Sequence, residues 1–339
     1  MSPDRVTDVL DSADRLTAAG EWDKALQLLT DANRRAADPA IEVRLVIARH
    51  RAFAAPPSAG PTEGWPRPVA DAFAGHDGLP EVPANKLTAE LLAAALEHHG
   101  ALLVRRLLAA SVAERLLGEV RRAFESAEAS ALGAPASETS PWYEPFHPGE
   151  GYNFGGVERQ LWRFGAVLAV EAPRALFHLT EALRSAGVGD LIAEYLGEWP
   201  ALSAKKTSLR RSTGSPTVWH QDGAFLGDGT RTVNVWTALT PCGVDAPAVE
   251  VFARPFTEVV PPGTDGALHD WCVGPGKIER LGTHDIVQPE FAPGDALLLN
   301  QLTLHRTGGS PTMTKERYAV ESWFFAPSTY PFEQVPIAF

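Results

Sequence analysis

Cysteine is scarce in this sequence, which has only Cys242 and Cys272 among its 339 residues. Neither belongs to a C-x-x-C pair, so a disulfide framework and a zinc ribbon are both excluded. Long apolar runs are missing as well, and no stretch approaches the roughly 20 residues that a membrane helix needs. The opening MSPDRVTDVLDSADRL carries charges throughout and lacks the apolar centre of a signal peptide. We therefore expect a soluble cytoplasmic protein.

Positive charge is also in deficit, because 30 Lys and Arg residues face 42 Asp and Glu residues and leave a formal net charge of -12. Nucleic acids and anionic membranes both require a positive protein surface. We therefore expect neither as a partner, and we expect a small-molecule substrate that is neutral or cationic. The sequence contains no signal for a particular oligomeric state.

The first part of the chain predicts helices followed by a linker. Apolar residues recur at helical spacing through residues 1–55, and the stretch LTAAGEWDKALQLL resembles a tetratricopeptide helix pair. One such pair cannot bury its own apolar face, since solenoids need about three repeats. A small helical cap on a larger domain is therefore favoured over a peptide-binding scaffold. Residues 56–84 are rich in proline and glycine, which predicts a linker.

Residues 85–339 predict one large α+β domain. Amphipathic helices come first, and short runs rich in β-branched and aromatic residues follow from about residue 200. We expect residues 217–220 to form a short strand and residues 296–307 to form a single longer one. This order of elements indicates a double-stranded β-helix, also called a jelly roll or cupin-like core, flanked by helices.

Three side chains in the strand-rich half form a candidate metal site. His220 and Asp222 stand two residues apart in VWHQDGAF, and alternate residues of an extended strand point to the same side. His305 comes much later, near the end of PGDALLLNQLTLHRTG. Two imidazoles and one carboxylate, with three coordination positions left open, form the facial triad of non-haem Fe(II) oxygenases. A histidine at a strand end is more often a core or surface residue, but the matched contexts favour ligands here.

Arg317 and Thr307 extend this site. Arg317 should begin the strand after His305, where a guanidinium can pair with one end of a dicarboxylate whose keto-acid end chelates iron. Thr307 lies two residues after His305 and shares its face, so its hydroxyl can reach the same carboxylate. Simple metal binding would need no such anchor, which argues against a cupin-like binding protein.

Four features of the sequence carry a family resemblance, and they are W-H-Q-D-G, A-L-T, the P-G-D turn before H-R-T-G, and the arginine that follows. Together they resemble the phytanoyl-CoA dioxygenase family of Fe(II)/2-oxoglutarate oxygenases. The resemblance covers roughly residues 86–327. It implies a jelly-roll fold, Fe(II) as cofactor, and 2-oxoglutarate and O2 as co-substrates. It further implies that His220, Asp222 and His305 bind iron.

The resemblance also assigns the 2-oxoglutarate contacts. Arg317 would bind the C5 carboxylate, Thr307 would assist it, and Thr207 matches a polar position that contacts 2-oxoglutarate in some relatives. Lys205, Lys206 and Ser208 compete with Thr207 for this last role. The chain departs from the family after A-L-T, because Arg254-Pro255-Phe256 stands where relatives carry P-G-S-H. That departure affects substrate recognition and leaves the metal site intact. Asp222 fills the position that radical halogenases leave open for chloride, so hydroxylation or another oxidation is favoured.

The substrate is indicated only by class. Nine tryptophans and an aromatic loop suit sugars, and an acidic protein suits a cation. We expect a sugar-like or aminoglycoside scaffold in antibiotic biosynthesis, as in the related orthosomycin oxygenases. An amino-acid or small-acid hydroxylase is the alternative, and no basic cluster indicates an acyl-CoA. The candidate substrate contacts are Trp236, Asn234, Arg254, Tyr152, Phe154, Trp162 and Trp219.

Overall fold

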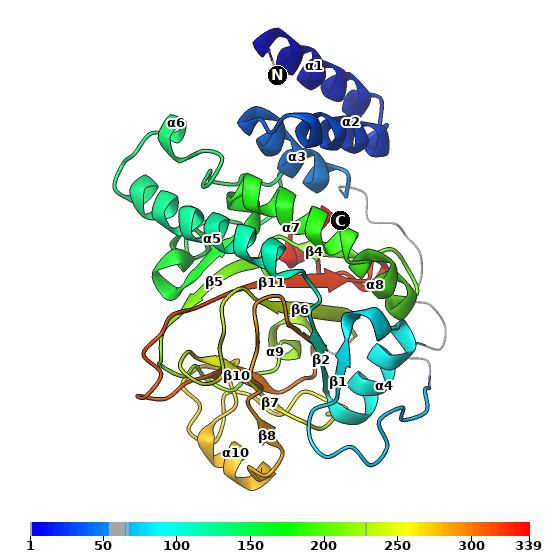
Figure 1. The fold of residues 1–339 in the computed structure, drawn as a ribbon, viewed down its shortest axis with the longest axis vertical. Helices are drawn as coiled ribbons and strands as arrows, with labels where there is room; N and C mark the ends of the chain where they lie inside the picture. The colour runs from blue at the N-terminus through cyan, green and yellow to red at the C-terminus, as the bar shows by residue number, and fades with distance from the viewer. Residues whose placement is uncertain (1, 54–64, 66–67, 228) are drawn as a thin grey trace.

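The computed structural model describes residues 2–53, 65, 68–227 and 229–339 of the chain. Three helices, α1 (Pro3–Ala18), α2 (Trp22–Arg35) and α3 (Pro39–Arg51), lie together at one end of the molecule (Figure 1). They are the helices expected within residues 1–55, whose status as a separate cap stays a prediction. Most of the expected linker lies outside the described residues.

The remaining helices are short to medium in length. They are α4 (Ala89–His99), α5 (Ala110–Ala131), α6 (Ala136–Thr139), α7 (Pro173–Ser185), α8 (Val188–Leu196), α9 (Gly223–Leu226) and α10 (Pro275–Leu281), with 3-10 turns η1 (Ala84–Lys86), η2 (Glu158–Phe164), η3 (Ala169–Glu171), η4 (Pro327–Thr329) and η5 (Phe332–Gln334). Within the described residues, every helix is too short or too polar to cross a membrane.

The strands form two sheets. They are β1 (Glu81–Pro83), β2 (Ala101–Arg105), β3 (Ala166–Leu168), β4 (Ala201–Ser203), β5 (Ser208–Ser212), β6 (Thr232–Ala238), β7 (Ala248–Phe252), β8 (Ile286–Val287), β9 (Ala296–Leu299), β10 (His305–Gly308), β11 (Arg317–Phe325) and β12 (Pro336–Ala338). Of these described strands, nine form a larger sheet in the order β1-β2-β9-β6-β11-β4-β12, with β5 beside β11 and β3 beside β5. The smaller sheet has the order β10-β7-β8.

Alternation along the strands explains why the two sheets enclose a core. Trp236, Leu297 and Ala319 of the larger sheet pack in one apolar cluster with Val249 and Val251 of the smaller sheet. The intervening residues of the larger sheet face the other way and pack with the helices α5, α7 and α8. The α+β jelly roll with flanking helices that the sequence predicts is therefore confirmed.

Two strand predictions are wrong, and one strand lies where a linker was predicted. Residues 217–220 form no strand, because only His220 makes an isolated β-bridge. The run 296–307 is not one strand, because it divides into β9 of the larger sheet and β10 of the smaller one. Asn300 begins the turn between them, where its side-chain oxygen accepts the N–H of Leu302 at 2.9 Å. The predicted linker also includes β1, which pairs in parallel with β2 and so belongs to the larger sheet.

Buried polar contacts attach α3 to the rest of the protein. Glu42 is fully buried and accepts Arg174 Nε of α7 with both carboxylate oxygens, each at 3.0 Å. Arg49 Nη1 donates to the carbonyl oxygen of Ala338 at 2.9 Å, which joins the same helix to β12. Helix α3 is thus held by interactions that are largely shielded from water.

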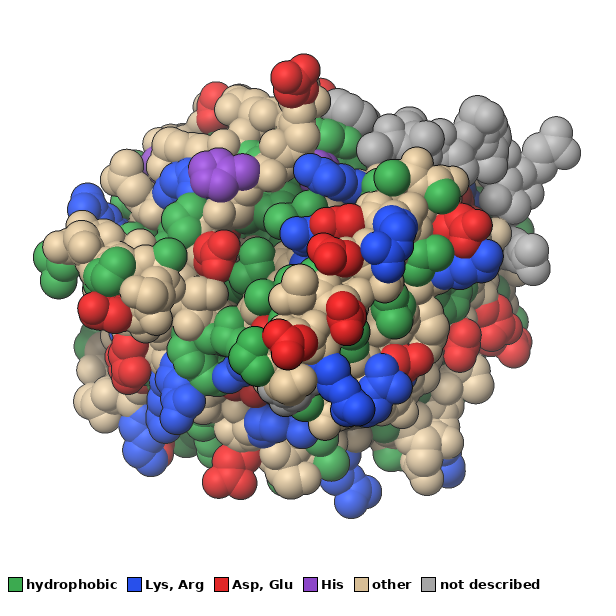
Figure 2. All heavy atoms as spheres, turned by 90° about the horizontal axis from the view of Figure 1, so that it is seen from above, with side chains coloured by type: hydrophobic (Ala, Val, Ile, Leu, Met, Phe, Trp, Pro, Cys, Tyr) green, Lys and Arg blue, Asp and Glu red, His purple; other side chains and the backbone are tan. Residues whose placement is uncertain are grey.

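The surface around these helices carries exposed charged residues, unlike the buried contacts of α3. Acidic and basic side chains are interspersed on the face seen in Figure 2, which looks down from the end that carries α1–α3. The Lys24–Glu21 pair is an example, with an N–O distance of 2.6 Å and exposed fractions of 71% and 42% for the two side chains. Such exposed pairs contribute little to stability.

This contrast yields a stability prediction. Replacing Glu42 with alanine leaves the Arg174 guanidinium at a largely buried interface without its carboxylate. We expect the free energy of unfolding to fall by roughly 2–3 kcal/mol. Urea unfolding followed by tryptophan fluorescence and circular dichroism measures the change. The control Lys24→Ala removes an exposed pair and should change it by less than about 0.5 kcal/mol. Equal effects in the two variants would show that α3 is not held by its buried carboxylate.

Candidate metal centre

His220 and His305 are held side by side by their backbones. The N–H of each residue donates to the carbonyl oxygen of the other, both at 3.0 Å. Residues opposite each other in such a hydrogen-bonded pair project their side chains to the same side. The two imidazole centroids are accordingly 4.4 Å apart. Thr217 N–H also donates to Thr307 O at 2.9 Å, so residues 217–220 run along β10, although only His220 forms a regular β-bridge.

Both imidazoles are oriented in the same way. Nδ1 of His220 is 3.1 Å from Val218 O, and Nδ1 of His305 is 2.9 Å from Thr303 O. A carbonyl oxygen can only accept, so each Nδ1 carries the proton and each Nε2 keeps a free lone pair. This is the usual second contact of a metal-binding histidine, which fixes both the tautomer and the plane of the ring.

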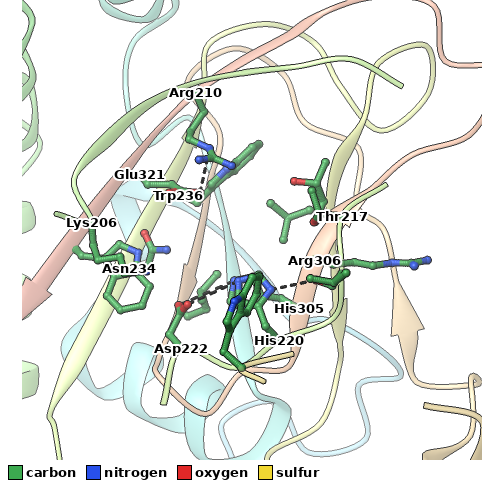
Figure 3. Close-up of a pocket in the computed structure, with 16 residues that line it drawn as sticks. Lys206, Arg210, Thr217, His220, Asp222, Asn234, Trp236, His305, Arg306 and Glu321 are labelled. Atoms are coloured by element: carbon green, nitrogen blue, oxygen red, sulfur yellow. Dashed lines mark hydrogen bonds and ion pairs between the residues drawn. The ribbon is translucent and has the colours of Figure 1, made fainter. Parts of the chain in front are cut away.

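Asp222 completes the group (Figure 3). Its Oδ1 lies 3.7 Å from His220 Nε2 and its Oδ2 lies 3.9 Å from His305 Nε2. One ligand atom from each residue lies within 4.8 Å of the other two. Asp222 is 3% exposed, and its Oδ2 has no hydrogen-bond partner. A buried carboxylate oxygen without a donor is costly unless a cation binds it.

The two neighbours of Asp222 explain the H-Q-D-G sequence. A Cβ on Gly223 would lie 2.8 Å from Val259 Cγ2 and 3.1 Å from Gln301 O, so a side chain would push Asp222 away from the histidines. The amide of Gln221 points the opposite way. It donates to Leu302 O at 2.5 Å and accepts the N–H of Val260 at 2.6 Å. Gln221 therefore fixes the loop that carries the ligands, a role that the sequence analysis missed.

The electrostatics of the group fit a divalent cation. Burial lowers the pKa of His220 well below its usual range, and the neighbouring His305 lowers it further. Burial raises the pKa of Asp222 to about 6, against the opposing effects of His305 and Lys206. A dication at their common centre favours the neutral imidazoles and the ionised carboxylate. The donor set of two nitrogens and one carboxylate is that of non-haem Fe(II).

Arg317 begins β11 as predicted and is 1% exposed. Its Nη2 donates to Ser212 Oγ, while Nε and Nη1 have no partner. Its guanidinium lies 5.2 Å from the ring centroid of Trp236, and burial lowers its pKa to about 10. Arg317 does not itself line the cavity beside the metal ligands, but its neighbour Trp236 does. Two unpartnered N–H groups on a buried guanidinium fit the C5 carboxylate of 2-oxoglutarate.

The other two predicted 2-oxoglutarate contacts differ in position. Thr307 lines the cavity next to His305. Thr207 is fully buried with an unpartnered hydroxyl, but it does not line the cavity. Of its competitors, Lys206 lines the cavity, whereas Lys205 pairs with Glu158 at 3.1 Å.

The cavity beside the metal ligands has a volume of about 220 Å³. Of the predicted substrate contacts, Asn234 and Trp236 line it. Trp219 instead packs in an apolar cluster with Phe252, and Arg254 pairs with Asp285 at 3.2 Å.

The remaining three candidates, Tyr152, Phe154 and Trp162, pack against the helix-covered core, and they too are missing from the cavity lining. This placement does not support direct substrate contact for any of the five candidates outside the lining.

Several lining residues were missed by the sequence analysis. Glu321 and Trp323 lie four and six residues after Arg317 on β11, so strand alternation alone places them on the same face. Trp271 carries no comparable local signal. Its ring lies 5.6 Å from that of His220 and 6.4 Å from that of Phe225, at the edge of the cavity.

A family model and several solved structures are similar to this chain. The family model of phytanoyl-CoA dioxygenase (PhyH) matches residues 96–315. No curated protein sequence matches the chain. Similar solved structures include the epimerase SnoN in complex with Fe3+, alpha-ketoglutarate and nogalamycin RO, with 18% identity, a TM-score of 0.47, and coverage of 70% of this chain and 83% of that chain.

Two further structures have similar values. AviO1 from Streptomyces viridochromogenes Tue57 is 17% identical with a TM-score of 0.43, covering 70% of this chain and 96% of that one. EvdO2 from Micromonospora carbonacea var. aurantiaca, complexed with 2-oxoglutarate, is 16% identical with a TM-score of 0.43, covering 68% and 88%. The family match spans well over half of the sequence and includes all three metal ligands. The chain belongs to the phytanoyl-CoA dioxygenase family and is an Fe(II)- and 2-oxoglutarate-dependent dioxygenase.

Proposed function

We propose that this dioxygenase oxidises an unactivated C–H bond of a polar small molecule in natural-product biosynthesis, by hydroxylation or oxidative ring closure. The observation that carries the proposal is the largely buried group of His220, Asp222 and His305, whose free ligand atoms face a small cavity. A cavity of about 220 Å³ suits part of a small molecule.

Each residue of the site has a defined part in this proposal. His220, Asp222 and His305 hold Fe(II), Arg317 binds the C5 carboxylate of 2-oxoglutarate, and Thr307 adds a hydroxyl to the same carboxylate. When bound, Fe(II) and 2-oxoglutarate supply the power to oxidise an unactivated C–H bond with O2. The protein orients the substrate and excludes water.

The walls of the cavity indicate the substrate scaffold. Trp271 and Trp323 offer flat aromatic surfaces, while Asn234 and Glu321 offer hydrogen-bonding groups. This combination suits a ring with polar substituents, as in a sugar-like molecule. An aminoglycoside is less favoured, because the ammonium of Lys206 also faces the cavity and would repel a cation. The same lysine favours the alternative of an amino-acid or small-acid substrate.

Anaerobic titration tests the cofactor pair. Adding Fe(II) and 2-oxoglutarate to the apo-protein should produce the visible charge-transfer band of the chelate. Asp222→Ala should weaken metal binding, and Arg317→Ala should weaken 2-oxoglutarate binding by roughly 10- to 100-fold, the value of a charge-assisted bidentate contact. Arg254→Ala serves as the matched control, because that arginine pairs outside the cavity. A correctly folded wild type without the band would contradict the assignment of the cofactor site.

Turnover distinguishes the enzyme from a cupin-like binding protein. Wild type supplied with Fe(II), O2 and 2-oxoglutarate should form succinate slowly even without substrate. His305→Ala removes a metal ligand and should reduce this rate by at least about 100-fold. Succinate is measured by chromatography, with Lys24→Ala as the control that keeps the wild-type rate. A wild type that shows the charge-transfer band but forms no succinate would favour the binding protein.

A further inference from the structure

Lys206 occupies an unusual position in the cavity wall. It lies in the turn between β4 and β5, and its Nζ is 3.7 Å from the ring centroid of Phe225 and 5.7 Å from that of Trp323. The two rings flank the ammonium and limit its movement. Nζ forms no ion pair or hydrogen bond within the part of the chain that the structure describes. The adjacent Lys205 is different, since its Nζ pairs with Glu158 at 3.1 Å.

Each arginine of the lining lies near a carboxylate. Arg210 Nε has no hydrogen-bond partner but lies 3.6 Å from Glu321 Oε1. Arg306 Nε lies 2.5 Å from Glu250 Oε2, and its side chain extends away from the metal ligands (Figure 3). The formal charges of these two pairs therefore cancel.

The proposed cofactors also leave no net charge to balance Lys206. The two positive charges of Fe(II) and the one on Arg317 equal the two negative charges of 2-oxoglutarate and the one on Asp222. Lys206 is then the cation of the described lining that is left in excess, because the carboxylates of Asp222 and Glu321, which both favour its charge, are already matched by iron and by Arg210. Burying an ammonium in this way is costly, and aromatic faces compensate only part of the cost.

A second polar group of the lining has no partner either. Asn234 is 5% exposed, and its Oδ1 is buried without a hydrogen-bond donor. In Figure 3 the side chains of Lys206 and Asn234 lie on the same side of the cavity, facing Asp222 and the two histidines. One wall therefore offers a free cationic donor next to a free polar amide, and both lie beside the aromatic surface of Trp323.

We propose that Lys206 forms a subsite for a carboxylate of the substrate, and that Asn234 binds a neighbouring polar group of the same molecule. This inference rests on the proposed function, because the cofactors supply the charge balance that leaves Lys206 free. It narrows the substrate class to a small molecule with one carboxylate and an apolar or ring face that packs on Trp323. A phosphate ester would bring a second negative charge, which the described lining does not balance.

Matched probes test directly whether the Lys206 subsite selects an anionic ligand over neutral and cationic ones. Benzoate, benzamide and benzylamine share a flat ring and differ in whether their substituent is anionic, neutral or cationic. Each is titrated into protein loaded with Mn(II) and saturating 2-oxoglutarate, and the paramagnetic broadening of its ring-proton NMR signals reports binding near the metal. We expect benzoate to bind at least about tenfold more tightly than benzamide, and benzylamine not to bind.

Three variants of two adjacent lysines show which residue binds the carboxylate. Lys206→Met keeps a side chain of similar length without the charge and should weaken benzoate binding about tenfold or more, while Lys206→Arg should retain most of it. Lys205→Met is the control and should bind benzoate as wild type does. The charge-transfer band with Fe(II) and 2-oxoglutarate is recorded for each variant, which checks the fold and the cofactor site separately.

The outcomes separate the two proposals. A missing band in wild type overturns the cofactor assignment. If wild type shows a normal band, the cofactor assignment stands and three results would each overturn the carboxylate subsite alone. These are that benzoate fails to bind, that benzamide binds as tightly as benzoate, or that Lys206→Met binds benzoate like wild type. The last result would mean that the probe is held by the metal ion instead of the lysine. Selective loss of benzoate binding in Lys206→Met supports the subsite.

Discussion

The reciprocal backbone hydrogen bonds between His220 and His305 are the interaction on which the rest of the site depends. They bring two ligands from distant parts of the sequence to one edge of the smaller sheet, and they fix both imidazoles on the same side. Asp222 then needs only the turn into α9 to reach the same point. Metal binding is thus built on backbone pairing, which depends little on the side chains that surround it.

The parts of the site that were predictable from the sequence are those set by local geometry. The start of β11 at Arg317 follows from strand and turn signals over a few residues. The two-residue spacing of His220 and Asp222 predicts a common side, but the structure reaches it through the turn into α9, where Asp222 has helical backbone angles, and not through strand alternation. The glycine after Asp222 is also a local signal, although its reason is not local. Only the structure shows that Val259 and Gln301 O occupy the space that a side chain would need.

The structure lends no support to several predicted substrate contacts, because composition does not tell which surface an aromatic residue meets. Tyr152, Phe154 and Trp162 come from a loop whose composition suggests a binding site, yet they pack on the helix-covered core. The division of 296–307 between two sheets likewise depends on a turn at Asn300 that interrupts an apolar run. Lys206 was named only as a competitor for another role, because a lysine becomes informative when its lack of a partner is known.

The whole chain is negatively charged, whereas its cavity carries an excess positive charge, and the charge of the cavity determines specificity. A net charge of -12 affects how a ligand approaches over distances comparable to the Debye length, about 8 Å at physiological salt. Inside the cavity a ligand meets a few groups at close range and low dielectric, where one unbalanced ammonium outweighs many screened surface carboxylates. An acidic protein can therefore select an anion, provided that the cation facing its substrate is one that no side chain of its own neutralises.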